Sequence, residues 1–182
     1  MTTHITNIRI HAAFLAIAGI LSLQACGGAT AAPAGEAATA PAQYVKAESE
    51  IEAGRYLVKI AGCNDCHTPG YLSNAGDVPE ARWLTGDSIG FQGPWGTTYP
   101  SNLRRLIATM DEEAWVHYAR TIETRPPMPW FNLRAFTEAD LRAIHRYIRS
   151  LPPDNTSVPD HVPPGRQPAT PYIVMVPKSP QP

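Results

Sequence analysis

Apolar side chains recur at helical spacing in two long stretches of the chain. Residues 48–62 place them among charged side chains, which predicts a helix that ends at Gly62. Residues 137–151 begin with a capping box at Thr137 and then repeat apolar positions every three or four residues until Pro152. The sequence therefore predicts an opening helix and a closing helix with a long stretch of chain between them.

The chain between these two helices has less regular patterning. Thr109 and Glu112 resemble a capping box, and a third helix is expected over residues 111–122. Residues 68–107 combine Gly, Pro and aromatic side chains without sustained periodicity, which predicts a long irregular segment. The expected fold class is all-α, with three main helices and long irregular loops.

The N-terminal part of the chain is typical of an export signal. The apolar run at residues 12–23 is shorter than the roughly 20 residues that span a bilayer, so residues 1–25 are interpreted as a signal peptide. Residues 23–26, Leu-Gln-Ala-Cys, resemble the bacterial lipobox, in which the cysteine is acylated. Cys26 is therefore the expected lipid anchor; the alternative is an ordinary cleavage site followed by a free thiol.

Two segments flank the expected folded domain at residues 48–153. Residues 26–47 are mostly Ala, Gly, Thr and Pro, which predicts a flexible linker. By the lipoprotein resemblance, Gly27 favours the outer membrane over the inner membrane, with the domain in the periplasm. Residues 154–182 form a Pro-rich extension, and its apolar residues 172–176 are expected to pack back on the domain, with partner binding as the alternative.

Net charge excludes one class of partner. The 182 residues carry a formal charge of -1, with a sequence pI near 6.6. A nucleic-acid-binding protein needs a basic surface that releases counterions from the phosphates. We therefore expect no nucleic-acid partner.

The sequence Cys63-Asn64-Asp65-Cys66-His67 carries the clearest chemical signal. Two thiols at this spacing can form thioethers with haem vinyl groups, and the adjacent imidazole can ligate the iron. Three alternatives are a thioredoxin-like redox pair, a zinc site and a structural disulfide. The first lacks strand and helix alternation nearby and the second lacks another cysteine pair. The motif predicts one covalently attached haem c.

An electron carrier usually has a second axial ligand, and a methionine opposite histidine raises the reduction potential. Met128 lies in Arg-Pro-Pro-Met-Pro-Trp, where three prolines stiffen the chain, so it is the expected ligand. Met110 falls at the start of the expected middle helix and Met175 in the tail. His117 and His145 are alternative ligands, but their helical positions favour ordinary histidines.

The order of helix, haem motif, loop, helix, methionine loop and helix resembles class I cytochrome c over residues 48–153. Within this class, the resemblance is to one module of the cytochrome subunits of membrane-bound alcohol and aldehyde dehydrogenases. It is carried by four segments: residues 63–68, 96–103, 127–130 and 141–151. Those subunits carry three such modules, whereas this chain has one haem motif. Arg104 and Arg105 also stand where the family has a Thr-Pro pair.

Further site residues follow from the resemblance and from donor chemistry. The family packs its closing helix across its first helix, which implies contact between Gly54 or Ala53 and Tyr147. Indole, phenol and amide groups can satisfy buried carboxylates. The candidate neighbours of the haem propionates are thus three residues: Trp95, Tyr99 and Asn102.

These features predict an electron-transfer protein rather than an enzyme. Its expected partners are redox proteins, such as a dehydrogenase or quinol-oxidising complex, an oxidase or another cytochrome, with the membrane contacted through the lipid anchor. Arg104, Arg105 and Arg125 are expected around the exposed haem edge, where they would steer partners. The alternative is a haem enzyme or sensor that binds peroxide or a nitrogen oxide at an open iron.

Overall fold

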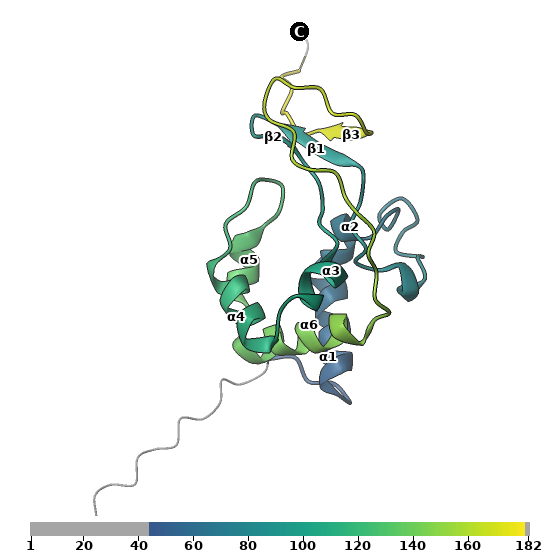
Figure 1. The fold of residues 1–182 in the computed structure, drawn as a ribbon, viewed down its shortest axis with the longest axis vertical. Helices are drawn as coiled ribbons and strands as arrows, with labels where there is room; N and C mark the ends of the chain where they lie inside the picture. Colours follow the sequence, from purple (N-terminus) through teal and green to yellow (C-terminus); the bar gives the residue numbers. More distant parts are fainter. Residues whose placement is uncertain (1–43, 181–182) are drawn as a thin grey trace, which may run out of the picture. The chain divides into compact units, whose positions relative to one another are not determined.

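The computed structural model of the chain describes residues 44–180 (Figure 1). In this part of the chain, the three expected helices are present as α1, α4 and α6, and three shorter α-helices accompany them. The helices are α1 (Glu50–Ile60), α2 (Cys63–His67), α3 (Leu103–Ala108), α4 (Glu112–Thr121), α5 (Trp130–Ala135) and α6 (Glu138–Ser150). The strands are β1 (Gly90–Gly93), β2 (Gly96–Thr98) and β3 (Tyr172–Val174), and a 3₁₀ turn covers Glu80–Arg82.

Side-chain caps define where the long helices begin. The Thr137 hydroxyl accepts a hydrogen bond from the Asp140 backbone N–H at 3.1 Å, so Thr137 is confirmed as the N-cap of α6. In place of the reciprocal bond that the Thr137 N–H would make in a capping box, the Thr137 hydroxyl donates to the Asp140 carboxylate at 2.8 Å. The capping box predicted for α4 is wrong. Asp111 caps α4, with its carboxylate accepting from the Ala114 N–H at 2.8 Å, whereas Thr109 is the C-cap of α3. A short helix that the sequence pattern did not reveal therefore ends where the middle helix was expected to start.

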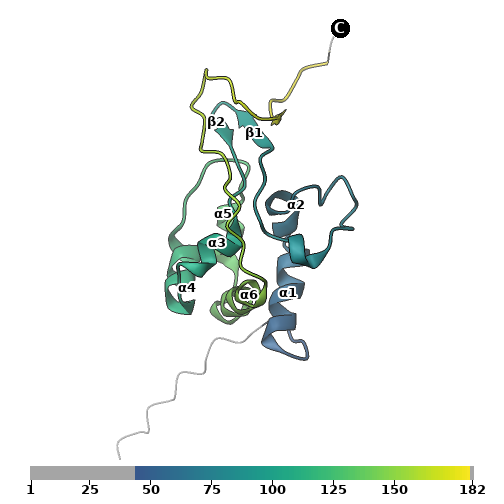
Figure 2. The same cartoon turned by 45° about the vertical axis from the view of Figure 1, so that its right-hand side comes forward.

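Helices α1 and α6 cross at close range, as Figures 1 and 2 show. A Cβ atom placed on Gly54 would lie 2.0 Å from the Ala143 carbonyl oxygen and 2.7 Å from Cβ of Tyr147. Only a residue without a side chain fits at such a crossing. The predicted contact between Gly54 and Tyr147 is confirmed.

The predicted all-α fold is wrong. Strands β2, β1 and β3 form a mixed sheet, in which β1 pairs antiparallel with β2 and parallel with β3. The strands have only three or four residues, too few for a two-residue alternation to be recognised in the sequence. Strand β3, the parallel partner of β1, also lies about 80 residues further along the chain. The local sequence pattern cannot predict a pairing between such distant segments.

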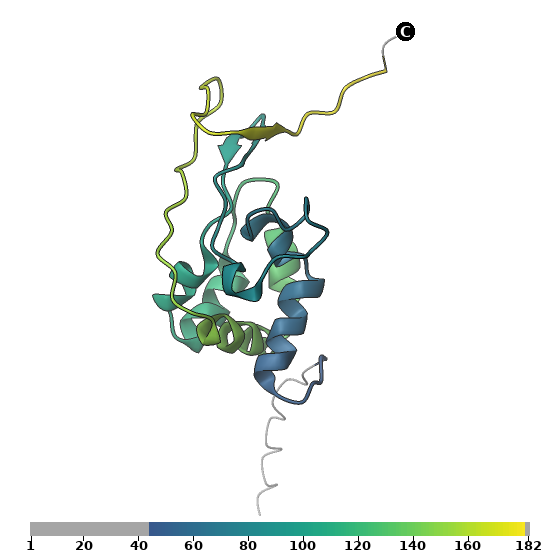
Figure 3. The same cartoon turned by 90° about the vertical axis from the view of Figure 1, so that its right-hand side faces the viewer.

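The C-terminal extension runs from the end of α6 along the helices to the sheet (Figure 3). Besides β3, it makes an antiparallel bridge between Val162 and Thr97. Residues 172–174 lie back on the domain through backbone pairing, with Ile173 beside Phe91. The apolar side chains from Ile173 to Val176 are exposed, so this contact is made by the backbone and not by buried apolar side chains. The extension is thus a strap across the hairpin of β1 and β2.

The core lies where α1, α4 and α6 meet. Its fully buried side chains include Leu57, Val58, Leu141 and Tyr147. Each buried aliphatic side chain of this size contributes about 1.5–3 kcal/mol of hydrophobic stabilisation. Among the helices of residues 44–180, none combines the length and the hydrophobicity that a bilayer crossing requires.

Candidate functional site

Residues 63–67, which carry the Cys-x-x-Cys-His motif, form their own short helix, α2. Gly62 precedes it in the left-handed conformation, with φ +73°, which lets the chain turn from the end of α1 into α2. Cys63, Cys66 and His67 occupy positions i, i+3 and i+4, which lie on the same face of a helix. The local fold therefore brings both thiols and the imidazole to one side of α2.

Both thiols are free, and both are partly buried. Burial raises the pKa of Cys63 to about 11 and also raises the pKa of Cys66. At neutral pH these groups are therefore thiols rather than thiolates. That state differs from a thioredoxin-like redox pair, whose attacking cysteine has a lowered pKa.

The orientation of the His67 ring is fixed by a backbone carbonyl. Nδ1 lies 2.7 Å from the Ser101 carbonyl oxygen. Because a carbonyl can only accept, Nδ1 must carry the proton, and Nε2 keeps its lone pair. Burial lowers the pKa of His67, opposed by this hydrogen bond, so the ring is neutral at pH 7. A neutral imidazole whose second nitrogen donates to a carbonyl is the form that ligates metals.

Three hollows meet around the motif, and Met128 lines each of them. The largest of these three, called the largest hollow below, has a volume of about 440 Å³ and is lined by Cys63 and Met128. A second, of about 110 Å³, reaches His67 and is walled by apolar side chains of α4 and α6. The third, of about 80 Å³, lies between His67 and β1. Together they surround the motif with mainly apolar walls, on which a flat apolar cofactor can pack.

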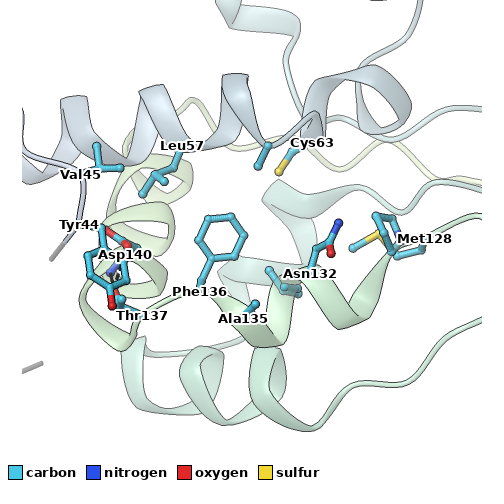
Figure 4. A pocket seen from close by; sticks show the side chains of 13 residues that line it. Tyr44, Val45, Leu57, Cys63, Met128, Asn132, Ala135, Phe136, Thr137 and Asp140 are labelled. Carbon is cyan, nitrogen blue, oxygen red and sulfur yellow. Dashed lines mark hydrogen bonds between the residues drawn. The ribbon is translucent and has the colours of Figure 1, made fainter. Parts of the chain in front are cut away.

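Figure 4 shows the largest hollow from close by. Cys63 enters it from the end of α1 and the start of α2, whereas Met128 enters from the segment before α5. Leu57 and Phe136 line the middle of the hollow, and Asp140 lies at the end away from Cys63 and Met128. The thiol and the thioether thus approach the same space from different parts of the chain.

The donor set of these hollows fits a c-type haem. Two thiols on one helix face match two vinyl groups, and a neutral imidazole and a thioether are both iron ligands. Among the described residues, His67 Nε2 has no hydrogen-bond partner, so its lone pair is available. Within residues 44–180, no group of three His, Cys, Asp or Glu side chains could hold a metal ion on its own.

The three expected propionate neighbours lie in different environments. Tyr99 lines the 80 Å³ hollow, and its hydroxyl accepts a hydrogen bond from Thr170. Trp95 donates to the Phe91 carbonyl at 3.3 Å and lines none of the three hollows. Asn102 caps α3, and its amide nitrogen donates to Asp154 at 2.6 Å. Of the three, only Tyr99 reaches the space around the motif.

The alternative axial ligands lie elsewhere. His117 is exposed on α4, whereas His145 is buried with Nε2 bonded to the Met110 carbonyl at 3.0 Å. Met110 packs against the core between α3 and α4, and Met175 is exposed just after β3. None of these four residues lines the three hollows.

Arg104 does not belong to an exposed rim, contrary to the sequence-based expectation. Its side chain is buried, and the guanidinium donates to the Pro152 carbonyl at 3.0 Å and to the Glu80 carbonyl at 2.9 Å. It ties the end of α6 to the segment before the sheet. Arg105 and Arg125 are exposed, and Arg125 lines the 80 Å³ hollow.

Three predictions from the sequence fall wholly or partly outside the described residues. The signal peptide and the proposed anchor at Cys26 lie in residues 1–43, which the structure does not describe. The linker at residues 26–47 is described only from Tyr44 onward. Tyr44 and Val45 line the largest hollow.

No protein-family model, no curated protein and no solved structure matches this chain.

Several residues of the site were not found from the sequence. Ser101 acts through its backbone carbonyl, which any residue type provides, so no side-chain signal marks it. Leu133 and Phe136 line the largest hollow from the segment that follows Met128. Their proximity in the sequence to the proline-flanked Met128 was the available signal.

Proposed function

We propose that the chain is a single-haem electron-transfer protein of the class I c-type cytochrome kind. Cys63 and Cys66 would form the two thioethers, and His67 and Met128 would ligate the iron. The observation that carries the proposal is the His67 ring: Nδ1 is bound to the Ser101 carbonyl at 2.7 Å, which leaves Nε2 free beside hollows that Met128 also lines. Haem c, when bound, supplies an iron that alternates between ferric and ferrous states.

The protein's own residues set the conditions for this exchange. Ser101 keeps His67 in the tautomer that presents Nε2. Apolar side chains from α3, α4 and α6, including Leu106, Trp115 and Ile148, wall the hollow next to His67 and exclude water. A low-polarity environment and a thioether ligand both favour the ferrous state, because they disfavour the extra positive charge of ferric iron.

We further propose that Arg105 and Arg125 attract redox partners to this side of the molecule. Both side chains are exposed, and Arg125 lies at the hollow between His67 and β1. Exposed charges act over about 10 Å at 0.1 M ionic strength and over longer distances at lower salt. They therefore raise association rates most at low salt. Exchanging Arg125 for Gln should therefore reduce both the rate of electron exchange with native partners and its dependence on salt.

The location of the protein is also part of the proposal. Export by the signal peptide and acylation of Cys26 would place the domain in the periplasm, tethered to a membrane, with the outer membrane favoured. There it would pass electrons between a dehydrogenase or quinol-oxidising complex and a terminal acceptor. Labelling of cells with a radioactive or clickable fatty acid tests the anchor: the wild-type chain should be labelled and Cys26→Ala should not.

An optical spectrum with and without dithionite, followed by redox titration, tests the function. The expected result is the spectrum of low-spin c-type haem at one haem per chain, with a single one-electron transition. In the oxidised protein a weak thioether-to-iron band should also appear. The paired variant Cys63→Ser with Cys66→Ser should lose the covalent haem. A wild-type chain, matured in a host with the attachment machinery, that showed no haem spectrum would overturn the proposal.

A further inference from the structure

The loop that carries Met128 has few hydrogen bonds of its own. Residues 123–129 contain three prolines, which have no backbone N–H to donate. Within the described chain, the Pro126 carbonyl is the one backbone group of residues 123–127 that makes a hydrogen bond. Its donor is the Thr98 hydroxyl, at 2.7 Å. The Glu123 side chain at the start of the loop pairs with Arg134, and the Met128 carbonyl at its end accepts from the Trp130 N–H. Between these two ends, the hydrogen bond from Thr98 ties the loop to the sheet.

Thr98 has one hydroxyl proton, and two carbonyls lie within reach. The Pro126 oxygen is at 2.7 Å and the Phe91 oxygen at 3.4 Å, so the proton goes to Pro126. Thr98 ends β2 opposite Phe91 of β1, and it lines the 80 Å³ hollow together with Met128. It thus links the sheet directly to the methionine loop.

The C-terminal extension in turn holds β2 in place. Thr97 and Val162 exchange two backbone hydrogen bonds, of 2.8 and 3.0 Å. The His161 ring bonds the Trp95 carbonyl at 2.9 Å. A Cβ atom on Gly96 would lie 2.2 Å from the Val162 carbonyl oxygen, so the extension approaches β2 as closely as a glycine permits. These contacts lie on the strap that Figure 3 shows beside the helices.

We propose that the C-terminal extension and Thr98 form a clamp that positions Met128 for binding to the iron. This inference rests on the proposed function, and it assigns Thr98 as a positioning residue. A methionine on an unclamped loop loses conformational freedom each time it binds the metal. A loop already held at Pro126 has lost much of that freedom in advance, so ligation by Met128 is favoured over its dissociation.

Competition by imidazole for the ferric iron of the full-length, haem-loaded chain tests the clamp. Added imidazole can bind only when Met128 has dissociated, so its apparent affinity reports the dissociated fraction. Thr98→Val removes the donor and keeps the side-chain shape. It should tighten imidazole binding about fivefold, the factor that one hydrogen bond of ordinary net strength contributes. It should also lower the midpoint potential and weaken the thioether-to-iron band.

Two matched variants separate positioning from a general structural effect. Thr98→Ser restores a hydroxyl and should return imidazole affinity to the wild-type value. Thr109→Val removes a threonine hydroxyl that also bonds a carbonyl at 2.7 Å, but at the end of α3 and outside the three hollows. It should leave imidazole affinity unchanged. If Thr98→Val behaved like Thr109→Val, Thr98 would have no positioning role.

Val162→Pro tests whether the extension is part of the clamp. It deletes the N–H that donates to Thr97 and should tighten imidazole binding in the same direction as Thr98→Val. The thioether-to-iron band should weaken in both variants. Wild-type values of both measurements in Val162→Pro would remove the extension from the clamp.

The clamp and the proposed function fail in different ways. Absence of haem from the matured wild-type chain, or a Met128→Ala variant with unchanged imidazole affinity, would contradict the haem ligation itself. A haem-loaded chain in which Met128→Ala binds imidazole far more tightly, while Thr98→Val binds it as the wild type does, would contradict the clamp alone.

Discussion

Replacing Gly54 by Ala probes the crossing of α1 and α6, which lies beside the proposed haem site. The added Cβ would lie 2.0 Å from the carbonyl oxygen of Ala143, 2.6 Å from its carbonyl carbon and 2.7 Å from Cβ of Tyr147. Non-bonded atoms rest at about 3.5 Å, so the two helices must separate locally by about 1.5 Å. None of the three atoms lies at the end of a flexible side chain, so rotamer changes cannot relieve the overlap.

The magnitude follows from two opposing effects. Overpacking of a buried site costs about 1–3 kcal/mol, and this overlap is severe enough for the upper end of that range. Ala is a better helix former than Gly by about 1 kcal/mol. The free energy of unfolding should therefore fall by about 2 kcal/mol, which lowers the urea midpoint by about 1 M.

Urea unfolding followed by circular dichroism measures this change in the haem-loaded protein. Lys59→Ala, on an exposed position of the same helix, is the matched control and should stay within about 0.5 kcal/mol of the wild type. A Gly54→Ala midpoint at or above the wild-type value would show that helix propensity outweighs the contact. The close crossing of α1 and α6 would then be incorrect.

Three further predictions concern the site and its support. Met128→Ala should keep the covalent haem, lower the midpoint potential and let carbon monoxide bind ferrous iron. Met110→Ala is the control. An unchanged midpoint potential in Met128→Ala would exclude Met128 as the iron ligand. In haem-free chain, alkylation of Cys63 should accelerate only as the pH approaches 11, because burial keeps the thiol protonated below that value; rapid reaction at pH 8 would contradict the raised pKa. Arg104→Met should lower the free energy of unfolding by about 2 kcal/mol, because it removes the Arg104 donor from the Pro152 carbonyl and one of the two donors from the Glu80 carbonyl, which also accepts from the Trp83 N–H; exposed Arg105→Met should change it little, and equal effects would refute the buried role of Arg104.

The long helices were accessible from the sequence because their causes are local. Helix α6 shows its Thr137 cap, its apolar spacing and its terminating prolines within one stretch of chain. The spacing of Cys63, Cys66 and His67 also carries its meaning locally, because one helical turn brings the three side chains to one face. The contact of Gly54 with Tyr147 was expected through the family resemblance rather than from any pattern in the residues.

The sheet and the methionine clamp depend on contacts between distant segments. Phe91 pairs with Ile173, and Thr98 bonds the Pro126 carbonyl, but neither residue type specifies its partner. Arg104 is another example: adjacent arginines suggest a solvated face, yet carbonyls of Glu80 and Pro152 converge on its guanidinium and bury it. Such positions become visible only when the fold brings their partners together.

Intact mass spectrometry of the mature chain from a host with haem-attachment machinery tests the central proposal most directly. The polypeptide should carry the added mass of one haem, and peptide mapping should place it on residues 63–67. The mass should revert to that of the bare polypeptide when Cys63 and Cys66 are both replaced by Ser. A wild-type chain whose mass shows no added porphyrin would contradict the proposal.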